Sequence, residues 1–343
     1  MSSLHNEIKA ITSSNDKNDY IKLGELNHYL TQHNISQLSL PIPEIDEAYN
    51  IILVLFQIEI ILAHGNEYSE LETLFRTAST SPYLKNIINS TFIPRENYKE
   101  LYIKVKYNDL LTDYQYLVQT PSNRKLIDVI NKKMLIVNYM PLNDEIYASL
   151  TKLLNLKILE LCIISSYDFR KQNTLEYLSK NLSLEKDEYS HELVQLVQLL
   201  QSNRIIPRNL WLNVITSDLH NNYQLIISKH LDPKQLVVSW LENNIVILTK
   251  YYTTIKIDKI YRLFDLEQDI NVQQVALDMI IHKKLPPNSR IDQINGILVF
   301  GEIEANPEVS KIARTGGNSI NDLNEHISDI GQIMNDICFK LQA

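Results

Sequence analysis

Glycine and cysteine are scarce in this chain of 343 residues, and both shortages narrow its possible functions. Seven glycines leave few positions where the backbone can adopt a positive φ or approach a ligand closely. No Gly-x-Gly occurs, so a phosphate-binding loop is not expected. Cys162 and Cys338 lie far apart and outside any Cys-x-x-Cys motif, which favours a reducing compartment. We therefore expect a protein of the cytoplasm and nucleus.

The sequence also lacks the motifs of a catalytic centre. A zinc hydrolase needs imidazoles and a carboxylate that converge on the ion, but no His-x-His occurs, and no two histidines are three or four residues apart. Acidic pairs such as Asp265 and Glu267 lie in polar turns, where solubility explains them better than acid–base chemistry. We therefore predict no enzyme activity, no catalytic residues, no metal and no cofactor.

Long hydrophobic runs are missing as well. The most apolar run, Ile51 to Leu62, is interrupted by Gln57 and Glu59 and is shorter than the ~20 residues that a membrane span needs. We expect a buried helix there and no membrane partner. The N-terminus has no basic region followed by an apolar stretch, so no secretory signal is expected. A net charge of −8 argues against a protein that mainly binds phosphates.

Apolar residues recur at helical spacing from the N-terminus to about residue 250. Prolines separate these segments, for example at Ser81-Pro82, Ile206-Pro207 and Asp232-Pro233, and each proline stops one helix or opens the next. Such a series favours a solenoid of helix pairs, and a compact bundle is the alternative. We predict a mainly α protein whose helical-repeat arm covers residues 1–185 and is followed by a helical bundle.

The pattern changes near residue 250, where β-prone residues replace the leucine-rich helical pattern. The expected elements are a helix over 236–249, a strand over 251–256, helices over 257–264 and 272–282, and a hairpin over 290–300. Asn295-Gly296 between β-prone runs is the strongest short hairpin signal and is typical of a type I′ turn. This order of elements is that of a winged-helix domain, which we place at about residues 235–300.

Two stretches resemble a known family. Trp240-Leu241-Glu242-Asn243-Asn244 with the residues up to Ile260, and the hairpin Ile291 to Phe300, resemble the PCI domain of proteasome lid, COP9 signalosome and initiation factor 3 subunits. The Ile-Asp-Gln of the hairpin resembles the COP9 signalosome subunits in particular. The resemblance covers about residues 235–300 well, and it implies a PCI domain over 186–300.

The resemblance also implies a function. A COP9 signalosome scaffold subunit would support the removal of Nedd8 from cullin-RING ubiquitin ligases, with the metalloprotease centre in a different subunit. Its partners would be other PCI and MPN subunits and, through the complex, a cullin-RING ligase. A proteasome lid or initiation factor 3 scaffold subunit is the alternative.

The sheet of the winged helix is the first predicted contact surface, because a free strand edge can pair with another chain. The predicted docking edge consists of Thr254, Ile255, Arg290, Ile291, Asp292, Gln293, Ile297 and Val299. A winged helix can also bind DNA, but the segment 272–284 offers only His282, Lys283 and Lys284, at its end. Nucleic-acid binding is therefore the less favoured alternative.

The C-terminal segment is the second predicted contact surface. Residues 301–318 are polar and contain Gly316-Gly317, so we expect a linker. A closing helix over 319–343 carries an apolar seam at spacings of three and four. The seam consists of Ile320, Leu323, Ile327, Ile330, Met334, Ile337 and Leu341. Such a stripe can pack on its own domain, but the resemblance favours an assembly helix in an inter-subunit bundle.

Overall fold

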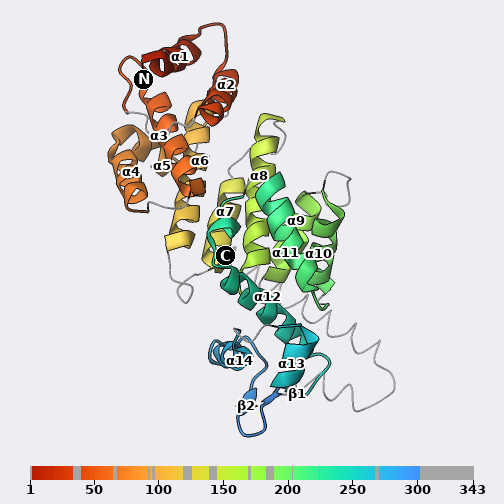
Figure 1. Ribbon diagram of the computed structural model, residues 1–343. Helices are drawn as coiled ribbons and strands as arrows, with labels where there is room; N and C mark the ends of the chain where they lie inside the picture. The colour runs from red at the N-terminus through yellow and green to blue at the C-terminus, as the bar shows by residue number, and fades with distance from the viewer. Residues whose placement is uncertain are drawn as a thin grey trace, which may run out of the picture. The chain divides into compact units, whose positions relative to one another are not determined.

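The segments with helical spacing fold as helices, which confirms the predicted mainly α fold (Figure 1). The computed structural model divides into two units, Met1–Ile247 (unit 1) and Leu248–Ala343 (unit 2). It describes residues 2–33, 40–64, 68–91, 93–94, 97–118, 126–138, 145–168, 171–182, 189–202, 204–223, 225–266 and 270–301. The predicted linker beyond Gly301 and the predicted seam lie outside the described residues.

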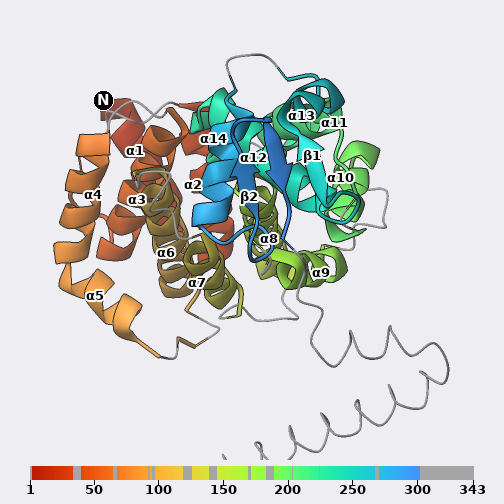
Figure 2. The same ribbon diagram turned by 90° about the horizontal axis from the view of Figure 1, so that it is seen from below.

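Unit 1 is a succession of helices that pack on their neighbours in the chain. They are α1 (Ser2–Ser13), α2 (Asp19–Gln32), α3 (Glu47–His64), α4 (Tyr68–Thr80), α5 (Pro82–Asn89), α6 (Tyr98–Val118), α7 (Leu126–Asn138), α8 (Glu145–Ile164), α9 (Lys171–Asn181), α10 (His191–Ser202), α11 (Arg208–Asn213) and α12 (Pro233–Leu248). From α3 to α11 each helix contacts the next one, and Figure 2 shows α6 to α9 following one another across the unit. This packing fits a solenoid-like arm.

Prolines and capping side chains start several of these helices where the sequence predicts breaks. Pro82 is the first residue of α5, and the hydroxyl of Ser81 accepts a hydrogen bond from the N–H of Leu84 at 3.3 Å. Pro207 stands directly before α11, and Pro233 opens α12. A proline costs little at these positions because the first N–H groups of a helix have no partner within the helix.

α3 is the apolar centre of the N-terminal part of unit 1. Among the described residues it is the one helix that is long and apolar enough to cross a membrane. Most of its side chains are nevertheless buried, and it packs against α4, α5 and α6. Its Glu59 carboxylate lies 2.6 Å from the ammonium of Lys106 on α6. This packing supports the predicted buried helix.

Four charged side chains, which we call the ion square, are buried between α6, α7 and α8. They are Asp109 and Asp113 of α6, Lys133 of α7 and Lys157 of α8. Each ammonium lies 2.5 to 2.8 Å from both carboxylates. Burial alone would raise the pKa of Asp109, but the two ammonium groups outweigh it and hold that pKa below its usual range. The four charges therefore compensate one another inside the helix stack.

The connection between α11 and α12 forms a π-helix, η2 (Val214–Asn222), and a 3₁₀ turn, η3 (Ser228–His230). This connection ties distant helices of unit 1 together. The buried carboxylate of Glu160 on α8 accepts a hydrogen bond from the N–H of Ser228 at 2.7 Å. Lys229 donates to the carbonyl of Ala63, at the end of α3, at 3.1 Å. Burial raises the pKa of Glu160 to about 7.

Unit 2 has the predicted order of strand, helix, helix and hairpin. Its elements are β1 (Thr254–Lys256), α13 (Ile257–Leu263), α14 (Val272–Ile281), β2 (Arg290–Asp292) and β3 (Ile297–Val299). The strands form one antiparallel sheet in the order β1-β3-β2. Ile255 of β1 pairs with Leu298 of β3, and both are buried, as are Ile260 of α13 and Met279 of α14. These residues form the core of a winged helix.

The turn of the hairpin differs from the prediction. A type I′ turn at Asn295-Gly296 needs positive φ at both residues, but only Gly296 has it, with φ 61°. Because Asp292 pairs with Ile297, four residues form the loop. The Asp292 carboxylate accepts hydrogen bonds from the N–H groups of Ile294 and Asn295 at 3.1 and 3.2 Å. The hairpin is confirmed, whereas the turn type is wrong, because the aspartate organises a wider loop.

The ion square predicts a large effect of removing one ammonium. In Lys133→Met, the carboxylates of Asp109 and Asp113 share a single buried counter-ion, and breaking a buried pair in this way costs about 3–5 kcal/mol. We expect the free energy of unfolding in urea, followed by circular dichroism, to fall by that amount. The control is Lys132→Met, because Lys132 is exposed on the same helix. Equal losses in both variants would contradict the prediction.

Glu160 predicts a pH-dependent stability. Below its ordinary pKa of 4.5 the carboxyl is neutral in both the folded and the unfolded chain. Because burial favours the neutral form in the folded chain, the free energy of unfolding falls as pH rises from about 4.5 to about 7. Glu160→Gln keeps an oxygen for the Ser228 N–H but cannot ionise. Relative to the wild type, the free energy of unfolding of the variant should therefore rise between pH 5 and pH 8, by up to roughly 3 kcal/mol.

Thermal unfolding at the two pH values measures this gain. The same substitution at exposed Glu192 is the control and should leave the difference between pH 5 and pH 8 as in the wild type. A Glu160→Gln protein whose melting temperature follows the wild type at both pH values would disprove the role of the buried carboxyl.

Candidate assembly surface

Among the described residues, the sheet of unit 2 has two edges without a neighbouring strand, which belong to β1 and β2, because β3 is the central strand. The N–H of Phe300 donates to the carbonyl of Thr253 at 2.9 Å. Along an antiparallel strand, residues whose N–H and C=O groups point toward the partner strand alternate with residues whose groups point away from it. The N–H and C=O groups of Thr254 and Lys256 therefore point away from β3. By the same alternation, Ile291 directs its backbone groups outward from β2. These three residues offer the backbone sites for an added strand.

The predicted docking residues lie on all three strands of this sheet and in the hairpin loop. Thr254 and Ile255 lie in β1, Arg290, Ile291 and Asp292 in β2, Gln293 in the loop, and Ile297 and Val299 in β3. Ile255 is 3% exposed, so its side chain belongs to the core. Ile297 and Val299 are partly exposed, but their backbone is paired on both sides. Whether these residues dock on a partner stays a prediction.

Large apolar side chains are exposed around the sheet, and sequence reasoning missed them. On α14, Val275 and Met279 are buried, whereas Leu277 is 39% and Ile281 62% exposed. Ile294 in the hairpin loop is 95% exposed. Leu277 fits the apolar pattern of the helix and therefore reads as core, but its four-residue spacing to Ile281 marks a second apolar stripe. Large exposed apolar side chains on a small unit are candidates for a protein contact surface.

The exposed side of α14 does not resemble a DNA-reading helix. Such a helix presents basic or amide side chains to the major groove, and α14 presents Leu277 and Ile281 instead. The amide of Gln274 donates to the carboxylate of Asp278 at 2.9 Å. Lys283 lies beyond the end of α14, where the backbone has left the helical conformation (φ 55°). The exposed side of α14 is therefore more apolar than that of a helix that reads DNA.

Residues of the Trp240 to Asn244 stretch hold unit 1 together. The indole N–H of Trp240 donates to the carbonyl of Ile206 at 2.9 Å. The side-chain oxygen of Asn244 accepts a hydrogen bond from the N–H of Ile206 at 2.8 Å, and Glu242 accepts one from the N–H of Tyr167 at 3.1 Å. Polar residues therefore anchor α12 to the loops before α9 and α11, because buried polar groups must find partners.

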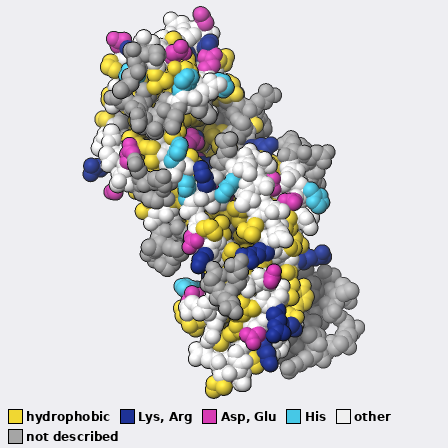
Figure 3. Space-filling model, in the orientation of Figure 1, with side chains coloured by type: hydrophobic (Ala, Val, Ile, Leu, Met, Phe, Trp, Pro, Cys, Tyr) yellow, Lys and Arg dark blue, Asp and Glu magenta, His cyan; other side chains and the backbone are white. Residues whose placement is uncertain are grey.

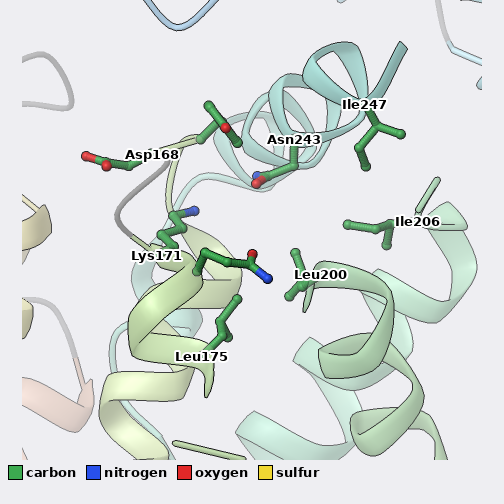
Figure 4. Close-up of a pocket in the computed structure, with 9 residues that line it drawn as sticks. Asp168, Lys171, Leu175, Leu200, Ile206, Asn243 and Ile247 are labelled. Atoms are coloured by element: carbon green, nitrogen blue, oxygen red, sulfur yellow. The ribbon is translucent and has the colours of Figure 1, made fainter. Parts of the chain in front are cut away.

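A pocket of about 160 Å³ lies beside this anchor (Figure 4). Lys171 and Asn243 point into it, while Asp168 points away. The ammonium of Lys171 donates to the carbonyl of Ser165 at 2.6 Å, and the amide of Asn243 donates to the carbonyl of Ser239 at 2.7 Å. Both groups serve the helix packing.

A second pocket, of about 660 Å³, is lined by residues of α2, α3, η2 and the segment that follows it. It contains His64, His220 and Lys229 beside apolar side chains. Burial lowers the pKa of His220. Over the described part of the chain, no group of three His, Cys, Asp or Glu side chains is placed to hold a metal ion.

Comparison with known proteins supports a contact role for this region. A search of the curated proteins found no match. The family model described as PCI domain matches residues 219–302, from η2 to the end of the sheet. The expected start of the domain at residue 186 stays a prediction. PCI domains belong to scaffold subunits that contact other proteins in multi-subunit complexes. Residues 219–302 of this chain therefore carry the signature of a PCI domain.

Proposed function

We propose that this chain is a non-catalytic scaffold subunit of the COP9 signalosome, similar to its subunit 4. The main support is the exposed apolar side chains of unit 2, Leu277, Ile281 and Ile294, which lie within the PCI match. On α14, Leu277 and Ile281 occupy the side that would contact DNA in a DNA-binding winged helix. The hairpin from Ile291 to Phe300 supports the choice of complex through its resemblance to signalosome subunits. The chain would work in the cytoplasm and nucleus.

The geometry suggests how such a subunit would join its neighbours. A neighbouring chain can add a strand to the β1 edge through the backbone groups of Thr254 and Lys256. A partner surface that also covers Leu277, Ile281 and Ile294 would bury apolar area, which stabilises a contact by about 25 cal/mol per Å². The seam helix at 319–343 would add a second, bundled contact.

In this proposal the chain supports the removal of Nedd8 from cullin-RING ubiquitin ligases, and another subunit supplies the metalloprotease. The alternative is a scaffold subunit of the proteasome lid or of initiation factor 3, because the PCI match is common to all three complexes. Nucleic-acid binding is less favoured, since α14 exposes apolar residues.

Purification of the tagged chain from its own cells tests the choice of complex. Mass spectrometry of the co-purified proteins should identify PCI subunits and a metalloprotease subunit of the signalosome, and the chain alone should cleave no Nedd8–cullin conjugate. Subunits of the proteasomal ATPase ring, or translation initiation factors, among the partners would replace this assignment with the alternative.

A single charge in the apolar surface should weaken assembly. In Ile281→Glu a carboxylate replaces a side chain that is 62% exposed, so folding changes little, but burying that charge in an interface is costly. We expect at least a tenfold lower yield of co-purified partners. Leu135→Glu is the matched control, because Leu135 is 56% exposed on α7 of unit 1. Equal yields from the two variants would remove α14 from the assembly surface.

A further inference from the structure

A row of three exposed cations runs along α13 in unit 2. Lys256 directly precedes the helix, and Lys259 and Arg262 follow at intervals of three residues. Lys256 is the last residue of β1, whereas Lys259 and Arg262 are neighbours on the helix, with Cβ atoms roughly 5–6 Å apart. Figure 3 shows Lys and Arg side chains gathered over this part of unit 2. We call Lys256, Lys259 and Arg262 the basic row.

The basic row keeps a positive charge after its neighbours are counted. Asp258 lies four residues before Arg262 and Asp265 three residues after it, so one net positive charge remains when both carboxylates are counted. The ammonium of Lys259 lies 4.7 Å from the centre of the Tyr252 ring, a contact that holds the side chain but does not neutralise it. The rest of the chain is acidic, since the whole carries −8. Such a row attracts an acidic segment.

The chain leaves the sheet beside Thr253, which follows Tyr252, the residue whose ring contacts Lys259 in the middle of the row. The N–H of Phe300 donates to the carbonyl of Thr253, the residue after Tyr252, at 2.9 Å. Gly301 packs so tightly that a Cβ there would lie 1.6 Å from the carbonyl oxygen of Pro287. Glycine is required by this close approach, and it fixes the point from which the following residues start.

The residues directly after Gly301 have the charge that complements the row. Glu302, Glu304 and Glu308 occur within the next seven positions, and no basic residue interrupts them. An extended chain reaches roughly 3.3–3.6 Å per residue, so seven residues span about 24 Å. This reach exceeds the length of α13, which at about 1.5 Å per residue is close to 10 Å. The segment can therefore run along the whole row.

We infer that the basic row of α13 is the docking site of the acidic segment 302–308 of the same chain. Tethering gives the segment an effective concentration in the millimolar range, so even weak surface ion pairs can hold it there. This docking depends on charge and on where the chain leaves the sheet, so it does not depend on which PCI complex the chain joins.

Another basic site lies near the exit, at Lys283 and Lys284 after α14. It is the weaker candidate, because cations at a helix C-terminus already interact with the helix dipole. The two sites make different predictions, because the lysines that the segment contacts are different.

Carbodiimide cross-linking of the full-length chain tests the inference. This reagent joins a carboxylate to an amine only when the two touch. In the monomeric fraction we expect cross-linked peptides that join Lys256 or Lys259 to Glu302, Glu304 or Glu308. Their yield should fall about fivefold between 0.05 and 0.5 M NaCl, because salt screens surface charges.

Two charge-neutralised proteins provide the controls. Lys259→Gln with Arg262→Gln should reduce the cross-links at Lys256 at least threefold, whereas Lys283→Gln should leave them unchanged. Cross-links that join the segment to Lys283 instead of the row would overturn the inference, as would their absence from the monomer. Binding of a 20-base-pair DNA duplex that the double variant abolishes would assign the row to nucleic acid and also overturn it.

Discussion

The ion square between α6, α7 and α8 is the interaction on which unit 1 depends. Asp109 and Asp113 hold Lys133 and Lys157 at 2.5 to 2.8 Å, which sets the rotation of three helices about their axes. A rotation of one helix would leave a buried charge without its partner, and that is far more costly than a lost apolar contact. The stack therefore has one register rather than several of similar energy.

The rotation of α8 in turn positions the later part of unit 1. Glu160 lies three residues after Lys157, and its carboxylate receives the N–H of Ser228. Glu242 on α12 receives the N–H of Tyr167, which follows α8. Polar contacts between buried groups thus continue from the arm to the helices at the start of the PCI match. This continuity explains why so many polar side chains are buried in an otherwise apolar stack.

Unit 2 is a small module and therefore has a small hydrophobic core. Ile255, Leu298, Ile260 and Met279 fill it. The remaining apolar side chains, such as Ile281 and Ile294, stay in water at a cost that is recovered only when a partner covers them. Two free strand edges lie on the same module. The exposed surface of unit 2 therefore combines the features through which protein modules associate.

The sequence by itself determined the helices, their proline breaks and the winged-helix order, because these depend on local periodicity and on the backbone chemistry of proline. It also determined the hairpin, but not its turn, since the Asp292 carboxylate bonds to the loop only once both strands are paired. Only the tertiary structure decided that Asp109 and Lys133 are buried partners. Charged residues far apart in sequence normally indicate a solvated face, and burial depends on which helices meet.

The tertiary structure likewise decided the positions in the sheet. The strand order placed β3 in the centre, so Ile297 and Val299 have no free edge. It also left Leu277 exposed, although it is one of the apolar residues of α14. Strand order and the exposed side of a helix depend on contacts between distant segments, and no local pattern contains that information.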